Sequence, residues 1–400
     1  MNVIFLTLFR IKDIEARGIY EDLMRKFKNE GHQVYIVCPV ERREGLKTSL
    51  VEQNGVKILN VKTLNIQKTN VVEKGIGTLL IESQYIKAIK KYLSNVSFCL
   101  ITYSTPPITF TNVVRYLKKQ NPDAISYLQL KDIFPQNAVD IQMFSKGSLF
   151  YRFFRNKEKS LYKASDYIGC MSPANVEFVL KHNPEVDASR VEVAPNSIEL
   201  YDSRNDNENK DKIREKYGLP TDKPVFIYGG NLGKPQGIPF LMKCLDANAN
   251  RTDCHFLVIG TGTELPRLRA WYDEEKPQSV TIMNGLPKAD YDQLVKACDV
   301  GLIFLDHRFT IPNYPSRLLS YLENKMPVLC ATDPNTDMGR IAEANGYGYW
   351  CESNSVEAFT VILDNMIHSD RKFMGEKGYE FLKANYLMEN TYNAIMRHFK

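Results

Sequence analysis

Short runs of β-branched and other apolar residues alternate with amphipathic stretches along most of the chain. Between the first two runs, residues 16–31 have helical spacing and end at Gly31, a residue type that favours helix termini. A strand followed by a helix, repeated many times, is typical of parallel α/β layers. In the first half the apolar runs that predict strands cover 2–8, 32–39, 97–107, 124–132, 166–172 and 190–196.

The pattern changes after residue 200. Residues 201–224 are polar and interrupted by proline, which predicts a linker with a short helix. We therefore expect two Rossmann-like α/β domains, 1–200 and 201–383, with a last helix at about 384–400 that packs back on the first domain. Ligands of such sheets bind at the carboxyl ends of the strands, so the cleft between the domains is the expected site. The strands of the second domain are predicted at 225–233, 254–262, 280–285, 299–305, 326–332 and 347–352.

Composition narrows the class of protein. With 44% hydrophobic and 25% charged residues, the 400-residue chain has a globular composition, and its apolar runs are far shorter than the ~18 residues that cross a bilayer. "MNVIFLTLF" lacks the features of a signal peptide. The eight cysteines are scattered singly, without metal-type spacing, which favours reduced thiols in the cytoplasm. Residues 1–200 hold 28 Lys and Arg against 20 Asp and Glu, which predicts an anionic partner for this half or reflects ordinary surface variation.

Glycine-bearing turns follow three strands of the second half. Glycine allows close backbone approach to a ligand, and a helix that begins near Gly237 would point its positive end at a phosphate group. A single turn of this kind is a weak signal, but three in sequence predict a phosphate site. The candidate residues are Gly230, Asn231, Gly233, Lys234, Gln236, Gly260, Gly262, Gly285 and Leu286.

The segment 313–329, "NYPSRLLSYLENKMPVL", predicts a turn, a helix and a buried strand. Pro315 can begin a helix because its missing N–H would be unpaired there. Ser316 can cap the helix or contact phosphate, and the amides of Ser316, Arg317 and Leu318 form an anion-binding end. The Arg317 side chain either adds charge for a diphosphate or is solvated.

These motifs together resemble the donor half of family 4 glycosyltransferases of the GT-B fold, and most closely a WbuB-like subgroup of capsule and O-antigen synthesis. The ordered set is "YGGNLGKPQGI", "VIGTGTE", "NGLP", "DVGLIFL", "YPSRLLSYLENKMPVLC" and "IAEANGYGYWCE". In the first half, "RGIYEDLMRKFKNEGHQVYIVCP", "STPPITF", "LKDIFPQNAVD", "EKSLYKASDYIGCMSPAN" and "VEVAPNSIE" are similar to segments of the family's acceptor domain and hinge.

The resemblance implies a retaining transfer of a sugar from a nucleotide diphosphate, UDP by family precedent, without a cofactor or metal. The chain departs from the family in its charged residues. The usual Arg and Lys of the first glycine loop correspond to Asn231 and Gln236, and Lys234 either compensates or is solvated. The family's two Glu fall on Pro312 and Ser320. Ser320, or Glu323 three residues further on the same helix, is then the expected ribose contact.

Two aspartates are the candidates for chemistry. Asp132 follows a strand and can orient the acceptor hydroxyl, take its proton, or stabilise positive charge at the anomeric carbon; a structural helix cap is the alternative. In retaining enzymes of this fold the proton is thought to pass to the leaving phosphate. Asp306 either approaches the sugar or caps its own loop. Arg17 and the amide of Gly18 are expected to contact the acceptor or the donor phosphate.

A basic, aromatic stretch at 146–165 bears on location. The sequence places six Lys and Arg there against one Glu, interleaved with aromatic residues. This composition suits an anionic membrane surface, although a helix with its aromatics packed inward is the alternative. We do not expect nucleic-acid binding, since no nucleic-acid motif accompanies the charge.

We therefore expect a retaining, metal-independent glycosyltransferase on the cytoplasmic face of the membrane. Its acceptor would be a saccharide on an undecaprenyl-diphosphate type of lipid. The alternatives are a GT-B epimerase or hydrolase with the same donor site, and a non-catalytic subunit that binds sugar nucleotide.

Overall fold

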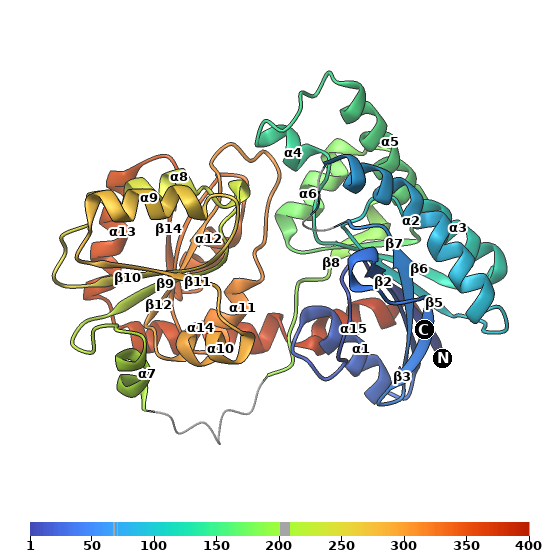
Figure 1. Ribbon diagram of the computed structural model, residues 1–400, viewed down its shortest axis with the longest axis horizontal. Helices are drawn as coiled ribbons and strands as arrows, with labels where there is room; N and C mark the ends of the chain where they lie inside the picture. The colour runs from blue at the N-terminus through green and yellow to red at the C-terminus, as the bar shows by residue number, and fades with distance from the viewer. Residues whose placement is uncertain (67–68, 70, 201–208, 400) are drawn as a thin grey trace. The chain divides into compact units, whose positions relative to one another are not determined.

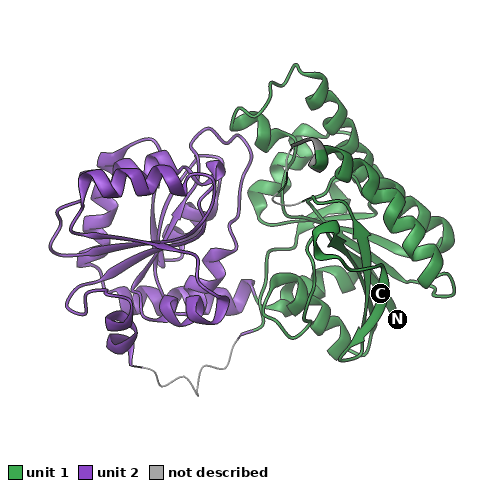
Figure 2. Cartoon of the chain, in the orientation of Figure 1, with its two compact units in different colours: residues 1–199, 387–400 green, residues 200–386 purple. Residues whose placement is uncertain are grey.

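The computed structural model describes residues 1–66, 69, 71–200 and 209–399 (Figure 1). The chain forms two compact units, coloured separately in Figure 2: unit 1 comprises Met1–Glu199 and Leu387–Lys400, and unit 2 comprises Leu200–Tyr386. The last helix, α15 (Met388–Met396), packs against α1 (Ile19–Asn29) of unit 1, where the Phe27 and Tyr392 rings lie 5.0 Å apart. Of the predicted linker, 201–208 lie outside the described residues, and the rest contains α7 (Lys210–Lys216).

In the described part of unit 1, eight strands form one sheet in the order β3-β4-β2-β1-β5-β6-β7-β8. All neighbouring strands are parallel except β3 and β4, which form an antiparallel hairpin through Asn54 and Gly55. This hairpin was not predicted from the sequence, although Asn-Gly between apolar runs is a hairpin signal. The strands are β1 (Asn2–Leu6), β2 (Gln33–Glu41), β3 (Ser49–Gln53), β4 (Val56–Thr63), β5 (Leu100–Ser104), β6 (Ile125–Leu130), β7 (Tyr167–Cys170) and β8 (Val191–Val193).

Helices cover this sheet and connect its parallel strands (Figure 1). α1 buries its apolar stripe of Leu23, Met24 and Phe27, which follows the 3.6-residue period predicted for 16–31. No helix in the described ranges is long and apolar enough to span a bilayer. The remaining helices of unit 1 are α2 (Val71–Tyr92), α3 (Thr111–Gln120), α4 (Gln136–Asp140), α5 (Leu149–Ala164) and α6 (Pro173–His182).

In unit 2, the described residues form a parallel sheet of six strands in the order β11-β10-β9-β12-β13-β14. All six strands were predicted. They are β9 (Val225–Asn231), β10 (His255–Thr261), β11 (Val280–Asn284), β12 (Val300–Phe304), β13 (Val328–Thr332) and β14 (Gly348–Glu352). Besides α7, its helices are α8 (Ile238–Ala247), α9 (Leu265–Glu275), α10 (Lys288–Lys296), α11 (Arg317–Glu323), α12 (Met338–Ala344), α13 (Val356–His368) and α14 (Arg371–Asn385).

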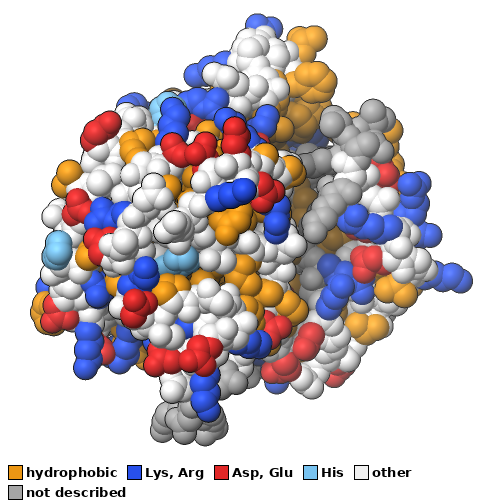
Figure 3. Space-filling view, turned by 60° about the vertical axis from the view of Figure 1, so that its left-hand side comes forward, with side chains coloured by type: hydrophobic (Ala, Val, Ile, Leu, Met, Phe, Trp, Pro, Cys, Tyr) orange, Lys and Arg blue, Asp and Glu red, His pale blue; other side chains and the backbone are white. Residues whose placement is uncertain are grey.

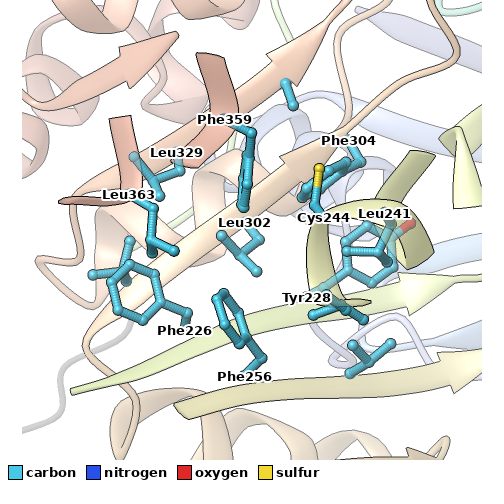
Figure 4. Close-up of a cluster of buried hydrophobic side chains, with 14 of the residues drawn as sticks. Phe226, Tyr228, Leu241, Cys244, Phe256, Leu302, Phe304, Leu329, Phe359 and Leu363 are labelled. Atoms are coloured by element: carbon cyan, nitrogen blue, oxygen red, sulfur yellow. The ribbon is translucent and has the colours of Figure 1, made fainter. Parts of the chain in front are cut away.

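The core of unit 2 lies between its sheet and α8 and α13. Phe226, Phe256 and Leu302 come from adjacent strands and pack beneath Phe359 and Leu363 of α13 (Figure 4). Burying side chains of this size contributes about 1.5–3 kcal/mol each. This packing fixes the ends of the strands, and therefore the turns that follow them.

The strand order marks one place in each sheet where a ligand is expected. In unit 2 the chain runs outward from β9 through β10 to β11, and then returns to the other side of β9 at β12. In unit 1 the same reversal occurs between β1 and β5. Ligands of open parallel sheets bind at the carboxyl ends of the strands beside such a reversal.

Candidate functional site

The three glycine-bearing turns of unit 2 meet at one edge of the sheet. Gly260 of β10 lies opposite Gly230 of β9 and Asn284 of β11 in the strand register. The turn after β9 continues through a short 3-10 turn (Lys234–Gln236) to Gly237 and α8. The predicted helix start near Gly237 is therefore confirmed.

Close contact between the turns explains two of these glycines. A Cβ atom on Gly260 would lie 1.8 Å from the carbonyl oxygen of Gly230, and one on Gly262 would lie 2.3 Å from that of Leu232. The Leu232 N–H also donates to the carbonyl of Thr261 at 2.9 Å. Gly260 and Gly262 thus let the first two turns join, which holds the β9 turn in one conformation.

Arg317, the first residue of α11, lies over the β9 turn. Its guanidinium carbon is 4.4 Å from the centre of the Tyr228 ring, and its Nη2 donates to Oε1 of Gln236 at 2.6 Å. A Cβ atom on Gly230 would lie 3.9 Å from the same Nη2. The Arg317 Nη1 is buried and has no hydrogen-bond partner among the described residues. The side chain is therefore not the solvated arginine considered as the alternative.

No carboxylate of the described residues pairs with this guanidinium. Its polar neighbours are the neutral amide of Gln236 and the tyrosines 228, 291 and 321. Burial raises the pKa of Tyr291 to about 12, so this phenol is neutral at physiological pH. Because arginine stays charged in proteins, the carboxyl end of the sheet beside β9 and β12 holds a cation without a counter-ion among the described residues. Such a group favours the binding of an anion.

Tyr321 connects β9 to β12 where these strands diverge. Its hydroxyl accepts a hydrogen bond from the Gly229 N–H of β9 at 3.2 Å. It donates to the carbonyl of Ile227 in β9 at 3.1 Å and to that of Leu302 in β12 at 3.4 Å. The Gly229 amide is therefore occupied within the protein. Tyr321 follows Arg317 by four residues, so both side chains project from the same face of α11.

The other predicted donor-site residues flank this cluster. Asn231, Lys234 and Gly285 are exposed. Ser316 is exposed and makes no side-chain cap bond, which leaves phosphate contact as the other role predicted for it. The Leu318 N–H donates to the carbonyl of Pro315 at 3.3 Å, so the prediction that this amide is free for an anion is wrong. Pro315 precedes Ser316, and α11 begins at Arg317. Gly233, Leu286, Ser320 and Glu323 are buried or partly buried. The roles assigned to these residues remain predictions.

Asp306, which follows β12, is held in its own loop. Its carboxylate accepts hydrogen bonds from the backbone N–H of Arg308 at 3.0 Å and from the guanidinium at 2.7 and 2.8 Å. Burial alone would raise the pKa of Asp306, but the hydrogen bonds and the charge of Arg308 outweigh it and lower the pKa. This is the loop-capping arrangement, and it leaves the ionised carboxylate neutralised by Arg308.

In unit 1, Asp132 follows β6 and is partly exposed. The hydroxyl oxygen of Thr105 accepts from the backbone N–H groups of Lys131 and Asp132, both at 3.0 Å, which fixes the chain direction. The Asp132 carboxylate accepts from Nδ2 of Asn137 at 2.6 Å and from the Ile133 N–H. Burial raises its pKa to about 6, although these two hydrogen bonds lower it. Asp132 can therefore change protonation near neutral pH, as acid–base groups of enzymes do.

Two further predicted contacts lie at the start of α1. The Gly18 N–H donates to Oδ1 of Asp22 at 3.1 Å, so this amide is occupied within unit 1. Asp22 also accepts from Arg25, which in turn bonds Glu199. Arg17 likewise takes part in an interaction, so its side chain is not free.

The basic, aromatic stretch 146–165 divides into two parts. At its C-terminal end, Tyr162 is buried, and three cations pair with carboxylates: Arg155 with Glu158, Lys157 with Glu82 and Lys159 with Glu185. Its N-terminal end is different, since Leu149 is 80% exposed and Phe150 is 69% exposed. Figure 3 shows hydrophobic side chains beside a cationic one at the top of the view, where the α4–α5 segment lies in Figure 1.

Sequence reasoning missed the groups that surround the two best candidates. Tyr228, Tyr291 and Tyr321 were not identified from the sequence, where the i, i+4 spacing of Arg317 and Tyr321 was the available signal. Near Asp132, sequence analysis did not identify Tyr20, Lys131 or Asn137. Tyr20 is far from Asp132 in sequence, and the positions of Lys131 and Asn137 depend on how the chain turns after β6.

Two successive parallel α/β units, the second followed by a helix that returns to the first, define the GT-B fold. Solved structures of this fold match nearly the whole chain. Sucrose-phosphate synthase from Thermosynechococcus elongatus matches with a TM-score of 0.76 at 15% identity, over 99% of this chain and 98% of that one. HepE from Anabaena, solved in complex with UDP, matches with a TM-score of 0.70 at 13% identity, over 100% and 99%. At such identity the likeness shows the fold.

The family follows from the sequence of unit 2. Residues 209–381 match the family described as glycosyl transferases group 1, so this unit carries a domain of that family. A probable glycosyltransferase, WbjE of Pseudomonas aeruginosa, is 24% identical over 261 residues, which are 65% of this chain and 64% of WbjE. The matches span less than two thirds of the length of the curated relatives.

Proposed function

We propose that this protein is a retaining glycosyltransferase. It would transfer a sugar from a nucleoside diphosphate, with UDP as the favoured nucleotide, to a lipid-linked saccharide during surface polysaccharide synthesis. Its group 1 domain and GT-B fold support the reaction class. Similarity to WcaI of Escherichia coli, described as a colanic acid biosynthesis glycosyl transferase, and to TuaC of Bacillus subtilis, described as a teichuronic acid biosynthesis glycosyltransferase, supports the pathway class.

The observation that carries the proposal is the unpaired guanidinium of Arg317. It lies at the strand reversal of unit 2, against Tyr228 and over the glycine turn, with Nη1 buried and without a partner. A diphosphate would supply the missing negative charge through charge-assisted hydrogen bonds. The Gly229 and Leu232 amides are bonded within the protein, so the remaining phosphate oxygens would be bound by those main-chain N–H groups of the turn that have no partner there. We therefore propose that donor binding needs no metal ion and no cofactor.

The transfer would break the bond between the anomeric carbon and the β-phosphate oxygen. A new bond to the acceptor oxygen would form on the same face of the sugar, which retains the anomeric configuration. The proton of the acceptor hydroxyl would pass to the leaving β-phosphate. Asp132 is the proposed catalytic residue of unit 1, where its carboxylate would orient the acceptor hydroxyl and stabilise positive charge at the anomeric carbon.

A lipid-linked acceptor requires the protein at a membrane surface. The exposed Leu149, Phe150 and Phe153 at the start of α5, beside the exposed Lys146 and Arg152, would enter the headgroup region of an anionic bilayer. We propose the cytoplasmic face, where nucleotide sugars are made.

The test is a transfer assay with the full-length protein. UDP- and GDP-sugars are supplied with lipid-linked saccharides in the presence of EDTA, and products are analysed by mass spectrometry and NMR. We expect a glycolipid with the anomeric configuration of the donor. Nucleotide release at the same rate without acceptor would indicate a hydrolase or epimerase. Donor binding without turnover in any mixture would indicate a non-catalytic subunit.

A further inference from the structure

Asn137, the second residue of α4, lies beside Asp132 in unit 1. Its Nδ2 donates to Oδ1 of Asp132 at 2.6 Å, a short bond of the charge-assisted kind. The Ile133 N–H supplies the other hydrogen bond to this carboxylate. An ionised carboxylate has about four acceptor positions, so about half remain available to a ligand.

The second polar atom of Asn137 is unsatisfied. Its Oδ1 is buried and accepts no hydrogen bond from any residue in the described ranges. An amide oxygen left in this state destabilises the folded protein, and most buried amide oxygens in proteins have a partner. Asn137 therefore presents a vacant acceptor atom next to the vacant acceptor positions of Asp132.

The groups that face Asp132 from other elements do not fill these positions. Tyr20 of α1 is the nearby titratable group, and burial raises its pKa to about 12, which keeps it neutral. Lys131 precedes Asp132, but its ammonium lies 3.5 and 3.4 Å from the carbonyl oxygens of Ala194 and Pro195. No cation of the described residues pairs with Asp132. The pair of acceptors would repel an anion and suits a neutral ligand that donates hydrogen bonds.

We infer that Asn137 is a positioning residue for Asp132, and that the two side chains together bind neighbouring hydroxyl groups of a saccharide acceptor. One hydroxyl donates to the Asp132 carboxylate and another to Oδ1 of Asn137. The amide group of Asn137 also stabilises the ionised form of Asp132. This inference rests on the proposed function for the identity of the acceptor, but the link between the two side chains does not.

The first test measures the pKa of Asp132 by NMR of the carboxyl carbon, without substrates. In Asn137→Leu the hydrogen bond that lowers this pKa is lost, so we expect the pKa to rise by about one unit. Asn183→Leu is the matched control, because the Asn183 Oδ1 is likewise buried without a partner, while its Nδ2 donates to the carbonyl of Val179. It should leave the Asp132 pKa unchanged. An unchanged pKa in Asn137→Leu would overturn the positioning role.

The second test uses transfer kinetics. In Asn137→Leu we expect the KM for the acceptor to rise about tenfold while the KM for the donor stays within twofold. The acidic limb of the kcat/KM pH profile should move upward with the pKa of Asp132. Equal changes in both KM values would refute the acceptor contact. If the wild-type protein transfers no sugar, the proposed function fails, whereas the NMR result still decides the positioning role.

Discussion

Replacing Asp132 with asparagine should stabilise the protein at neutral pH while it removes activity. Desolvation of the carboxyl group in the native state raises the pKa of Asp132 from 3.8 to about 6. The folded protein therefore binds this proton more tightly than the unfolded chain does. Between these two pKa values, stability falls as the pH rises. Asparagine keeps the shape of the side chain and carries no charge, so the variant avoids the free-energy cost of holding an ionised, desolvated carboxylate.

The size of the effect follows from the pKa shift. A shift of about two units corresponds to about 3 kcal/mol at a pH well above 6. Because Asp132 is partly exposed, we expect about 2 kcal/mol at pH 7.5, which raises Tm by about 4–8 °C for a domain of this size. About half of this difference should be absent at pH 5, where the unfolded chain is ionised and the native carboxyl is mostly protonated.

The measurement is thermal unfolding of both proteins from pH 5 to pH 8. Asp123→Asn serves as the control, because Asp123 is an exposed aspartate of the same unit and should change Tm little. The transfer rate of Asp132→Asn should fall by at least about a hundredfold. A Tm difference that is independent of pH, or a variant less stable than wild type at pH 7.5, would refute this account of Asp132.

Three further predictions concern other parts of the molecule. Tyr321→Phe should lower the free energy of unfolding by about 1–3 kcal/mol, because the buried amide of Gly229 loses its partner. Tyr347→Phe is the control and should change this free energy little, because the Tyr347 hydroxyl has no partner in the described residues. Urea titration measures both variants. Gly260→Ala places a Cβ atom 1.8 Å from a carbonyl oxygen and should abolish UDP binding or destabilise unit 2, as calorimetry and circular dichroism would show. Phe150→Ser should weaken binding to phosphatidylglycerol vesicles about tenfold in a sedimentation assay. Phe373 of unit 2 is 58% exposed, and Phe373→Ser should bind as wild type does. Equal losses in both variants would contradict a specific membrane-binding surface.

Sequence patterns predicted most of the architecture, because a buried parallel strand is a continuous apolar run bounded by turn residues. All six strands of unit 2 and the glycine turns follow from such runs. The β3–β4 hairpin was not predicted, although Asn54-Gly55 is a hairpin signal. The alternation of strands and helices on both sides of it predicts parallel strands, and the same pattern was expected here. The last helix was expected near 384–400, and the structure has α15 at Met388–Met396.

The candidate site was harder to predict because its important contacts are tertiary. Arg317 was identified as a candidate, but only the structure shows that Tyr228 lies under its guanidinium and that Gln236 bonds it. Asp306 was also a candidate, because its position after a strand would let it approach the sugar. The partner two residues away, Arg308, decides its environment, and a sequence does not show which way that side chain turns.

The proposed donor site depends most directly on the guanidinium of Arg317, which has no counter-ion among the described residues, and one measurement tests its role. The dissociation constants of UDP and uridine are determined by calorimetry, in EDTA, for wild type, Arg317→Gln and Arg251→Gln. Arg251 is the control because it already pairs with Asp253 and Asp364 near the opposite ends of the strands. We expect Arg317→Gln to weaken UDP binding by about 2–3 kcal/mol, or about 30- to 150-fold, with uridine binding unchanged. UDP binding equal to wild type in Arg317→Gln, or binding that disappears in EDTA, would contradict the account.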